Sequence, residues 1–96
     1  MSTLERLRTQ RQTLVALAAQ HGAENIRVFG SVAREEDAPS SDVDLLVNMQ
    51  PGRSLLDLVA LKREVEDLLQ RRADIVTENS LHPLIRNQVV EAALPL

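Results

Sequence analysis

The stretch from Phe29 to Asn48 reads FGSVAREEDAPSSDVDLLVN, and the rest of the chain can be arranged around it. It contains a Gly-Ser pair, ten intervening residues and an Asp-x-Asp pair at 42 and 44, which an apolar run follows at once. Alternate residues of a strand project from the same face of a sheet. We therefore expect Asp42 and Asp44 to direct both carboxylates to one side.

These residue types suit phosphate chemistry. Two neighbouring carboxylates repel unless a cation lies between them, and Mg²⁺ prefers oxygen ligands of this kind. Gly30 and Ser31 follow an apolar strand and offer backbone N–H groups and a hydroxyl to a phosphate. A phosphate site beside a carboxylate pair predicts phosphoryl or nucleotidyl transfer. Taken singly, each signal has an ordinary alternative, because Gly-Ser is usually a turn and Asp-x-Asp a common strand start.

Taken together, these residues resemble a known family. Gly-Ser-x10-Asp-x-Asp is the motif of the DNA polymerase β-like nucleotidyltransferase superfamily, and this chain is similar to its smallest members, the minimal nucleotidyltransferase (MNT) proteins. The resemblance runs from about Asn25 to the C-terminus, through RADIVT at 72–77 and SLHPLIR at 80–86. Two positions depart from the pattern: Glu35 stands where members often have Gly, and Ser40 where they often have Asp. Glu35 adds a negative charge near the expected phosphate site.

The resemblance implies a nucleotidyltransferase that uses ATP and two Mg²⁺ ions. Asp42 and Asp44 would hold the metal ions, and Asp74 would complete the second metal site and help to deprotonate the attacking hydroxyl. The nucleotide-binding residues would be Gly30, Ser31 and Arg34.

The resemblance also implies a partner. MNT proteins typically pair with a HEPN-domain protein, a helical ribonuclease-type toxin, so the implied reaction is transfer of AMP to a tyrosine hydroxyl of that toxin by its antitoxin. The assembly would be a hetero-oligomer or a homodimer. Two alternatives stay open: a non-catalytic antitoxin that acts by binding alone, and a small-molecule nucleotidyltransferase subunit completed by a separate helical protein.

Length, charge and composition argue against several other classes of protein. A chain of 96 residues predicts one domain spanning 1–96. A net charge of −3 gives no global basic field, and Phe29 is the sole aromatic residue, so direct nucleic-acid binding is not expected. The absence of cysteine suits the cytoplasm, and no segment approaches the length that spans a membrane.

Apolar periodicity and helix-end signals predict an α-β-α-β-α-β-α order. The expected helices are 3–20, a short one at 31–36, 54–71, and a last one from 81 or 83 to 93; the expected strands are 25–29, 42–49 and 73–77. His21-Gly22 ends the first helix, and Ser54 with Asp57 caps the third. The buried side of the third helix is expected to consist of Leu55, Leu58, Val59, Val65, Leu68 and Leu69.

Strand directions follow from the chemistry. The Gly-Ser pair ends the first strand and Asp42 begins the second, so these two strands must be antiparallel to meet. Asp74 begins the third strand, which must therefore run parallel to the second, with the helix 54–71 as the crossover. We predict an α/β fold (an α+β nucleotidyltransferase fold) with a small three-stranded mixed sheet and flanking helices.

The C-terminal region offers one more expectation. The last helix and the tail 94–96 carry more apolar surface than a small domain covers easily, which predicts an interface. The alternative is that they pack on their own sheet. His82 precedes a proline and is expected to be structural or exposed.

Overall fold

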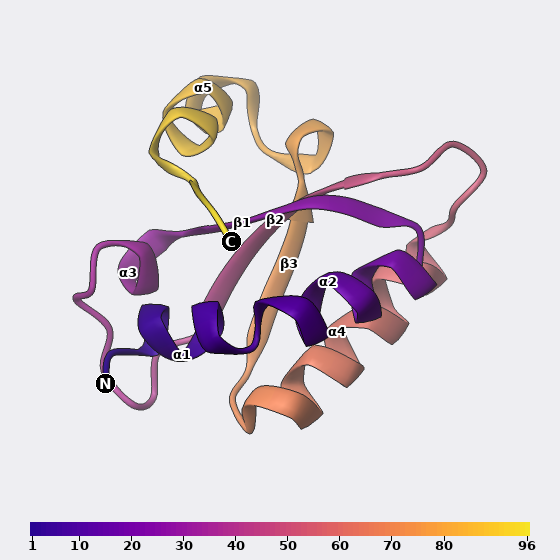
Figure 1. Ribbon diagram of the computed structural model, residues 1–96. Coiled ribbons are helices and arrows are strands. Elements are labelled where there is room, and N and C mark those ends of the chain that lie inside the picture. The colour runs from indigo at the N-terminus through magenta and orange to yellow at the C-terminus, as the bar shows by residue number, and fades with distance from the viewer.

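The computed structural model describes residues 1–96 and contains one mixed sheet with its helices (Figure 1). The elements are α1 (Thr3–Thr9), α2 (Arg11–Gln20), β1 (Ala23–Phe29), α3 (Gly30–Ala33), β2 (Val43–Met49), α4 (Leu55–Leu69), β3 (Ala73–Thr77), the 3-10 turn η1 (Glu78–Ser80), α5 (Pro83–Ala92) and β4 (Leu94–Pro95). None of the helices is both long enough and apolar enough to cross a lipid bilayer.

The predicted strand directions are confirmed, but the sheet has four strands and not three. Its order is β3-β2-β1-β4, with β1 antiparallel to β2 and β2 parallel to β3. The helix α4 forms the crossover between the two parallel strands, as that connection requires. The extra strand is the tail, which runs antiparallel to β1 at the free edge of the sheet.

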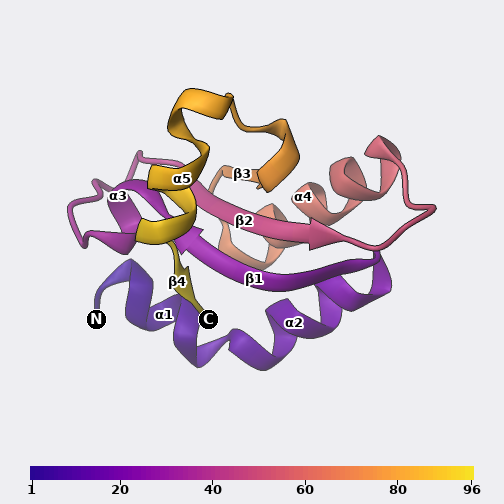
Figure 2. The same ribbon diagram turned by 90° about the horizontal axis from the view of Figure 1, so that it is seen from above.

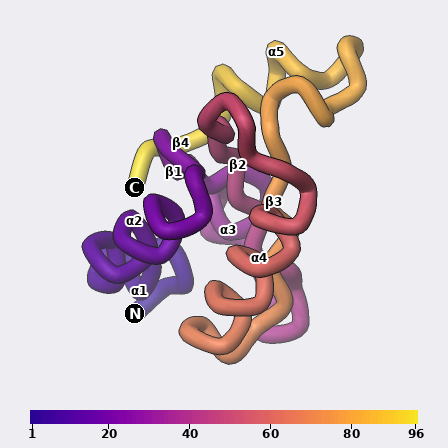
Figure 3. Tube along the Cα trace, turned by 90° about the vertical axis from the view of Figure 1, so that its right-hand side faces the viewer, coloured from indigo at the N-terminus to yellow at the C-terminus, as the bar shows by residue number.

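The helices α1, α2 and α4 cover one face of the sheet, and α5 lies on the opposite side (Figures 1 and 3). In β2, the alternating residues Val43, Leu45 and Val47 join the apolar core beneath those three helices. Asp44 lies between two of them in sequence, so its side chain belongs to the opposite face. The face that carries α5 is therefore also the face of the carboxylates.

The predicted helix 3–20 is wrong in one respect, because the chain breaks it into α1 and α2 at Gln10. Gln10 has φ −101° and ψ 12°, and its N–H bonds to the carbonyl of Arg6 as the C-cap of α1. No proline or glycine marks the break. Leu7 lies before the break and Leu14 after it, and both side chains are completely buried. The change of direction therefore goes with tertiary packing, since the sequence carries no local signal for it.

The cap of α4 is as predicted, and its buried face is predicted in part: Val65 and Leu69 are buried, and Leu58 and Leu68 are partly buried against the core. The N–H of Ser54 donates to Asp57 Oδ2 at 2.9 Å, which is half of a capping box. The fully buried residues of the helix are Leu61, Val65 and Leu69. Leu55 is 73% exposed and Val59 is 40% exposed, so two residues expected in the core lie outside it.

Other element boundaries shift by a few residues. The strand β1 begins at Ala23, two residues early, and its register with β2 is irregular between Glu24 and Arg27, which is a bulge. The strand β2 begins after Asp42, and α3 is shorter than expected, ending at Ala33. His82 is structural, since its Nδ1 accepts from the N–H of Leu84 at the start of α5.

The tail follows the alternative prediction and packs on its own sheet. The N–H of Leu96 donates to the carbonyl of Ile26 at 3.2 Å, and Arg11 Nε donates to the carbonyl of Leu96. In the Cα trace, β4 lies beside β1 (Figure 3). Leu94 and Leu96 are partly buried against the core. The helix α5 differs, because Leu84 is 83% exposed, so an interface on α5 stays a prediction.

Removing residues 94–96 should therefore destabilise the domain, because two partly buried leucines and the edge pairing are lost. We expect a decrease of about 2 kcal/mol in the free energy of unfolding by urea. Leu84→Ala is the matched control, since it truncates a leucine that is already exposed, and it should change stability by less than about 0.5 kcal/mol. Equal effects of the two changes would contradict the packing of the tail.

Candidate active site

The sheet register brings the predicted site residues together. Phe29 pairs with Asp44 across β1 and β2, and Asp44 pairs with Asp74 across β2 and β3. Gly30 follows directly after Phe29 and begins α3. The end of β1 and the starts of β2 and β3 thus place a phosphate-type turn and two carboxylates in one row.

Gly30 is required at this position for two physical reasons. Its φ is +72°, in the left-handed region that side chains with a Cβ rarely adopt. A Cβ at this position would also collide with Asp44 Oδ2. The absence of a side chain therefore lets the backbone of the turn lie directly against the carboxylate.

Gly30→Ala should destabilise the chain and displace the Asp44 carboxylate. The left-handed φ alone costs about 1–2 kcal/mol for alanine, and the collision adds to that cost. Gly52→Ala separates the two effects, because Gly52 has φ +85° but no atom lies within 4 Å of the Cβ that alanine would add. Urea denaturation should show a larger loss for Gly30→Ala; equal losses would mean that the contact with Asp44 does not matter.

The electrostatics of Asp44 fit a cation site. Partial burial raises the pKa of the Asp44 carboxyl, and the neighbouring carboxylates of Asp74 and Asp42 raise it further. The guanidinium of Arg34 acts in the opposite direction. The charge of an ionised Asp44 is thus poorly solvated and is repelled by the neighbouring carboxylates. A bound divalent cation would offset both effects.

Asp42 and Asp74 are the exposed members of the site. Asp42 lies just before β2 and its Oδ1 is 3.7 Å from Nε of Arg72, an ion pair between two exposed side chains. As they stand, the three aspartates are not close enough together to form a set of three ligands for one ion. Their all-oxygen donor set nevertheless fits Mg²⁺, and exposed carboxylates can change rotamer.

The remaining predicted residues lie at the same end of the sheet. Ser31 is half-buried in α3. Arg34 is the C-cap directly after that helix, with its side chain 62% exposed and its Nε 3.1 Å from Glu36 Oε2.

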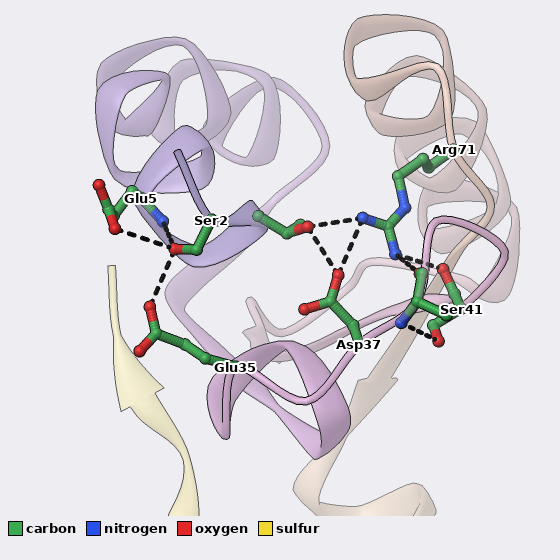
Figure 4. Close-up of polar contacts among 8 residues, drawn as sticks. Ser2, Glu5, Glu35, Asp37, Ser41 and Arg71 are labelled. Atoms are coloured by element: carbon green, nitrogen blue, oxygen red, sulfur yellow. Dashed lines mark hydrogen bonds and ion pairs between the residues drawn. The ribbon is translucent and has the colours of Figure 1, made fainter.

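The two departures from the family pattern have simple structural settings. Glu35 has φ +56°, a conformation that favours glycine, and its Oε1 accepts from Ser2 Oγ at 2.9 Å. Its charge is thus engaged at the N-terminus (Figure 4). Ser40 is exposed in the loop before Asp42.

The carboxylates lie where β2 and β3 begin, with Asp42 and Asp74 exposed and Asp44 half-buried. A cleft of about 570 Å³ exists elsewhere, lined by residues 1–3, the loop around Asp37 and the corner between α4 and β3, and it contains none of the three aspartates. That corner carries Arg71, the last residue of the helix predicted at 54–71. Its contacts with Asp37 join sequence positions too far apart for any local pattern to reveal.

Comparison with known proteins gives consistent findings. The family described as "Nucleotidyltransferase domain" matches residues 7–96. The chain is 39% identical over 84 residues to the putative protein adenylyltransferase MJ0435 of Methanocaldococcus jannaschii, covering 88% of this chain and 90% of that relative. It is also 39% identical over 74 residues to the protein adenylyltransferase MntA of Thermococcus cleftensis, covering 77% of this chain and 75% of that one.

Solved structures agree in fold. A structure described as a putative minimal nucleotidyltransferase is 51% identical, with a TM-score of 0.88, and the match covers 100% of this chain and 97% of that one. An MNT antitoxin in complex with tri-AMPylated Shewanella oneidensis HEPN toxin gives a TM-score of 0.68 over 92% of this chain and 69% of that one. Its identity of 18% shows the fold alone. The family match and the close relatives together establish that this chain belongs to the nucleotidyltransferase domain family, as a nucleotidyltransferase of the minimal type.

Proposed function

We propose that this chain transfers AMP from ATP to a tyrosine hydroxyl of a HEPN-type toxin and thereby acts as its antitoxin in the cytoplasm. One observation carries the proposal: the register Phe29–Asp44–Asp74 sets the Gly-Ser turn beside the carboxylates. The names of the relatives, protein adenylyltransferases, support the same reaction class.

The roles of the residues follow from their positions. Gly30 and Ser31 would hold the outer phosphates of ATP through backbone N–H groups and the serine hydroxyl, with Arg34 beside them. Asp42 and Asp44 would hold two Mg²⁺ ions, the second one shared with Asp74. When bound there, the ions would neutralise phosphate charge and stabilise the entering and leaving oxygens.

The proposed reaction is an in-line displacement at the α-phosphorus. A bond forms between the tyrosine oxygen and phosphorus, the bond to the β-phosphate oxygen breaks, and pyrophosphate leaves. The phenol proton passes to Asp74 or to water, and Asp74 is suited to this because its side chain is exposed at the edge of the site.

The exposure of the proposed site suits an acceptor that is itself a protein. Asp42 and Asp74 are exposed, so a side chain carried on a partner's surface can reach them. The helix α5 lies over the same end of the sheet, where β1 ends and β2 begins (Figure 2). Its exposed Leu84 and Ile85 are the apolar residues that we propose for docking the partner.

Incubation with Mg-ATP and a HEPN-type partner tests the proposal. The mass of the partner should increase by that of AMP, with the modification on a tyrosine. This chain contains no tyrosine, so it cannot be the tyrosine acceptor itself. A partner of unchanged mass that is nevertheless neutralised would favour the alternative of an antitoxin that acts by binding alone.

A further inference from the structure

A closed set of polar contacts joins three separate parts of the chain close to Asp42. Arg71, at the corner between α4 and β3, pairs with Asp37 of the loop before β2 at 3.2 Å, and their side chains are only 12% and 10% exposed. Thr3, at the start of α1, accepts from Arg71 Nη1 at 2.7 Å and donates to Asp37 Oδ2 at 2.6 Å. Figure 4 shows the side chains of Asp37 and Arg71 facing each other. We refer to Thr3, Asp37 and Arg71 as the clamp.

The clamp holds the backbone that leads into Asp42. Arg71 Nη2 donates to the carbonyl of Ala38 at 3.2 Å and to that of Ser41 at 2.6 Å. These two residues also close a turn of their own, because the N–H of Ser41 donates to the carbonyl of Ala38 at 2.9 Å. One guanidinium therefore secures both ends of this turn and the peptide group directly before Asp42.

The peptide group after Asp42 is secured by the neighbour of Arg71. The N–H of Val43 donates to the carbonyl of Arg72 at 2.9 Å. Asp74 lies two residues further along the same backbone, at the start of β3. The corner that carries Arg71 thus holds Asp42 on both sides and leads directly into Asp74.

Asp42 depends on this backbone support because its side chain has little of its own. It is exposed, and its ion pair is with another exposed side chain, so neither packing nor burial fixes its place. The clamp is well suited to give support: the hydrogen bond from Thr3, helped by Arg71, lowers the pKa of Asp37 despite its burial, so the carboxylate stays ionised at neutral pH. A planar guanidinium with several donors can serve several acceptors at once.

We propose that the clamp is a positioning device that fixes Asp42 relative to Asp74 and thereby sets the affinity of the site for a divalent cation. This inference rests on the proposed function, in which these aspartates bind metal. Thr3, Asp37 and Arg71 act through the main chain of residues 38–43 and touch neither nucleotide nor metal.

Mn²⁺ titration followed by electron paramagnetic resonance tests the clamp without any measurement of activity, since Mn²⁺ takes the same oxygen ligands as Mg²⁺. Arg71→Lys keeps the charge and the apolar stem, but a single ammonium cannot reproduce the fork of donors. We expect its Mn²⁺ affinity to fall by about tenfold, the typical effect of losing a residue that supports metal ligands. Arg71→Ala should cause at least the same loss. All titrations are made well below the melting temperature of each variant.

Arg72→Ala is the matched control, and it separates position from charge. Arg72 is exposed, its side chain forms the ion pair with Asp42, and its carbonyl still accepts from Val43 after the change. If only charge mattered, removing the positive charge of either arginine would strengthen cation binding at the site. If the clamp positions Asp42, loss of Arg71 should instead weaken cation binding. We therefore expect weaker Mn²⁺ binding in Arg71→Lys and Arg71→Ala, and no weakening in Arg72→Ala.

Two outcomes overturn the inference, and they differ in meaning. Wild-type Mn²⁺ affinity in Arg71→Lys and Arg71→Ala, with only the melting temperature lowered, would reduce the clamp to a contribution to stability. Failure of the unaltered chain to bind Mn²⁺ would contradict the metal site of the proposed function, and with it the clamp. If Arg71→Ala does not fold, Arg71→Lys alone decides.

Discussion

Replacing Asp42 and Asp44 together with asparagine is expected to abolish AMP transfer and the stabilisation of the chain by Mg-ATP, while the fold stays intact. Ligand at a hundred times its Kd stabilises a protein by about 2.7 kcal/mol. For a chain of this size, that corresponds to a rise in melting temperature of roughly 10–20 °C. The double variant should show almost none of this rise, and its transfer rate should fall by roughly 10³-fold or more.

The stability of the ligand-free double variant provides a second readout, with a defined sign. Burial raises the pKa of Asp44 in the folded state, and the carboxylates of Asp74 and Asp42 add to the effect. An acid with a raised folded pKa binds its proton more tightly when folded, so the unfolding free energy falls as pH rises through this range. At neutral pH the charge is therefore unfavourable, and asparagine should leave the melting temperature unchanged or higher.

The control variant also removes two negative charges, but at positions away from the proposed site. Asp67→Asn with Glu91→Gln changes two exposed carboxylates, one on α4 and one on α5. It should retain both the transfer activity and the full Mg-ATP shift. A full shift in the Asp42→Asn, Asp44→Asn protein would show that the nucleotide binds at another place on the chain.

The second large effect is expected for Asp74→Ala, which should stop AMP transfer and spare much of the nucleotide binding. Asp74 pairs with Asp44 in the sheet but lies outside the Gly-Ser turn that we propose for the phosphates. Its proposed roles are to complete the second metal site and to help to deprotonate the acceptor. Mass spectrometry of the partner should detect no added AMP, while the melting shift with Mg-ATP persists in large part.

The same variant distinguishes an antitoxin that acts as an enzyme from one that acts by binding alone. Partner association should survive Asp74→Ala, because the proposed docking residues Leu84 and Ile85 belong to α5. In cells that carry the toxin, a triple variant with alanine at positions 42, 44 and 74 should fail to protect. Full protection by the triple variant, together with no AMP on the partner of the unaltered chain, would make this chain a binding protein on an enzyme's fold.

Much of the site could be predicted from the sequence because its information is local. The Gly-Ser pair ends one strand and Asp42 begins the next, so a shared site requires β1 and β2 to be antiparallel, and the long helix after β2 allows the parallel β3 that Asp74 requires. The cap formed by Asp57 and Ser54 and the left-handed Gly22 after α2 are likewise short-range features. All of these depend on contacts within a few residues or on the geometry of one connection.

The packing of each helix depended on the tertiary structure. Leu55 and Leu61 are equally apolar, yet Leu55 is exposed and Leu61 is buried, because the approach of α4 to the sheet decides which side is covered. The break at Gln10 and the edge strand β4 have no turn signal in the sequence. The position of the tail is set by an unpaired edge of β1, and only the folded sheet presents that edge.

The sequence by itself therefore determined the strand directions and the family, and it predicted the residues that we propose for the site. The tertiary structure alone decided which residues form the proposed clamp: Arg71 meets Thr3 and Asp37 across 68 and 34 positions of the chain. Periodicity and caps report the interactions of residues three or four apart. A side chain that joins a helix end, a loop and the N-terminus acquires its partners only when the sheet brings them together, and no local pattern carries that information.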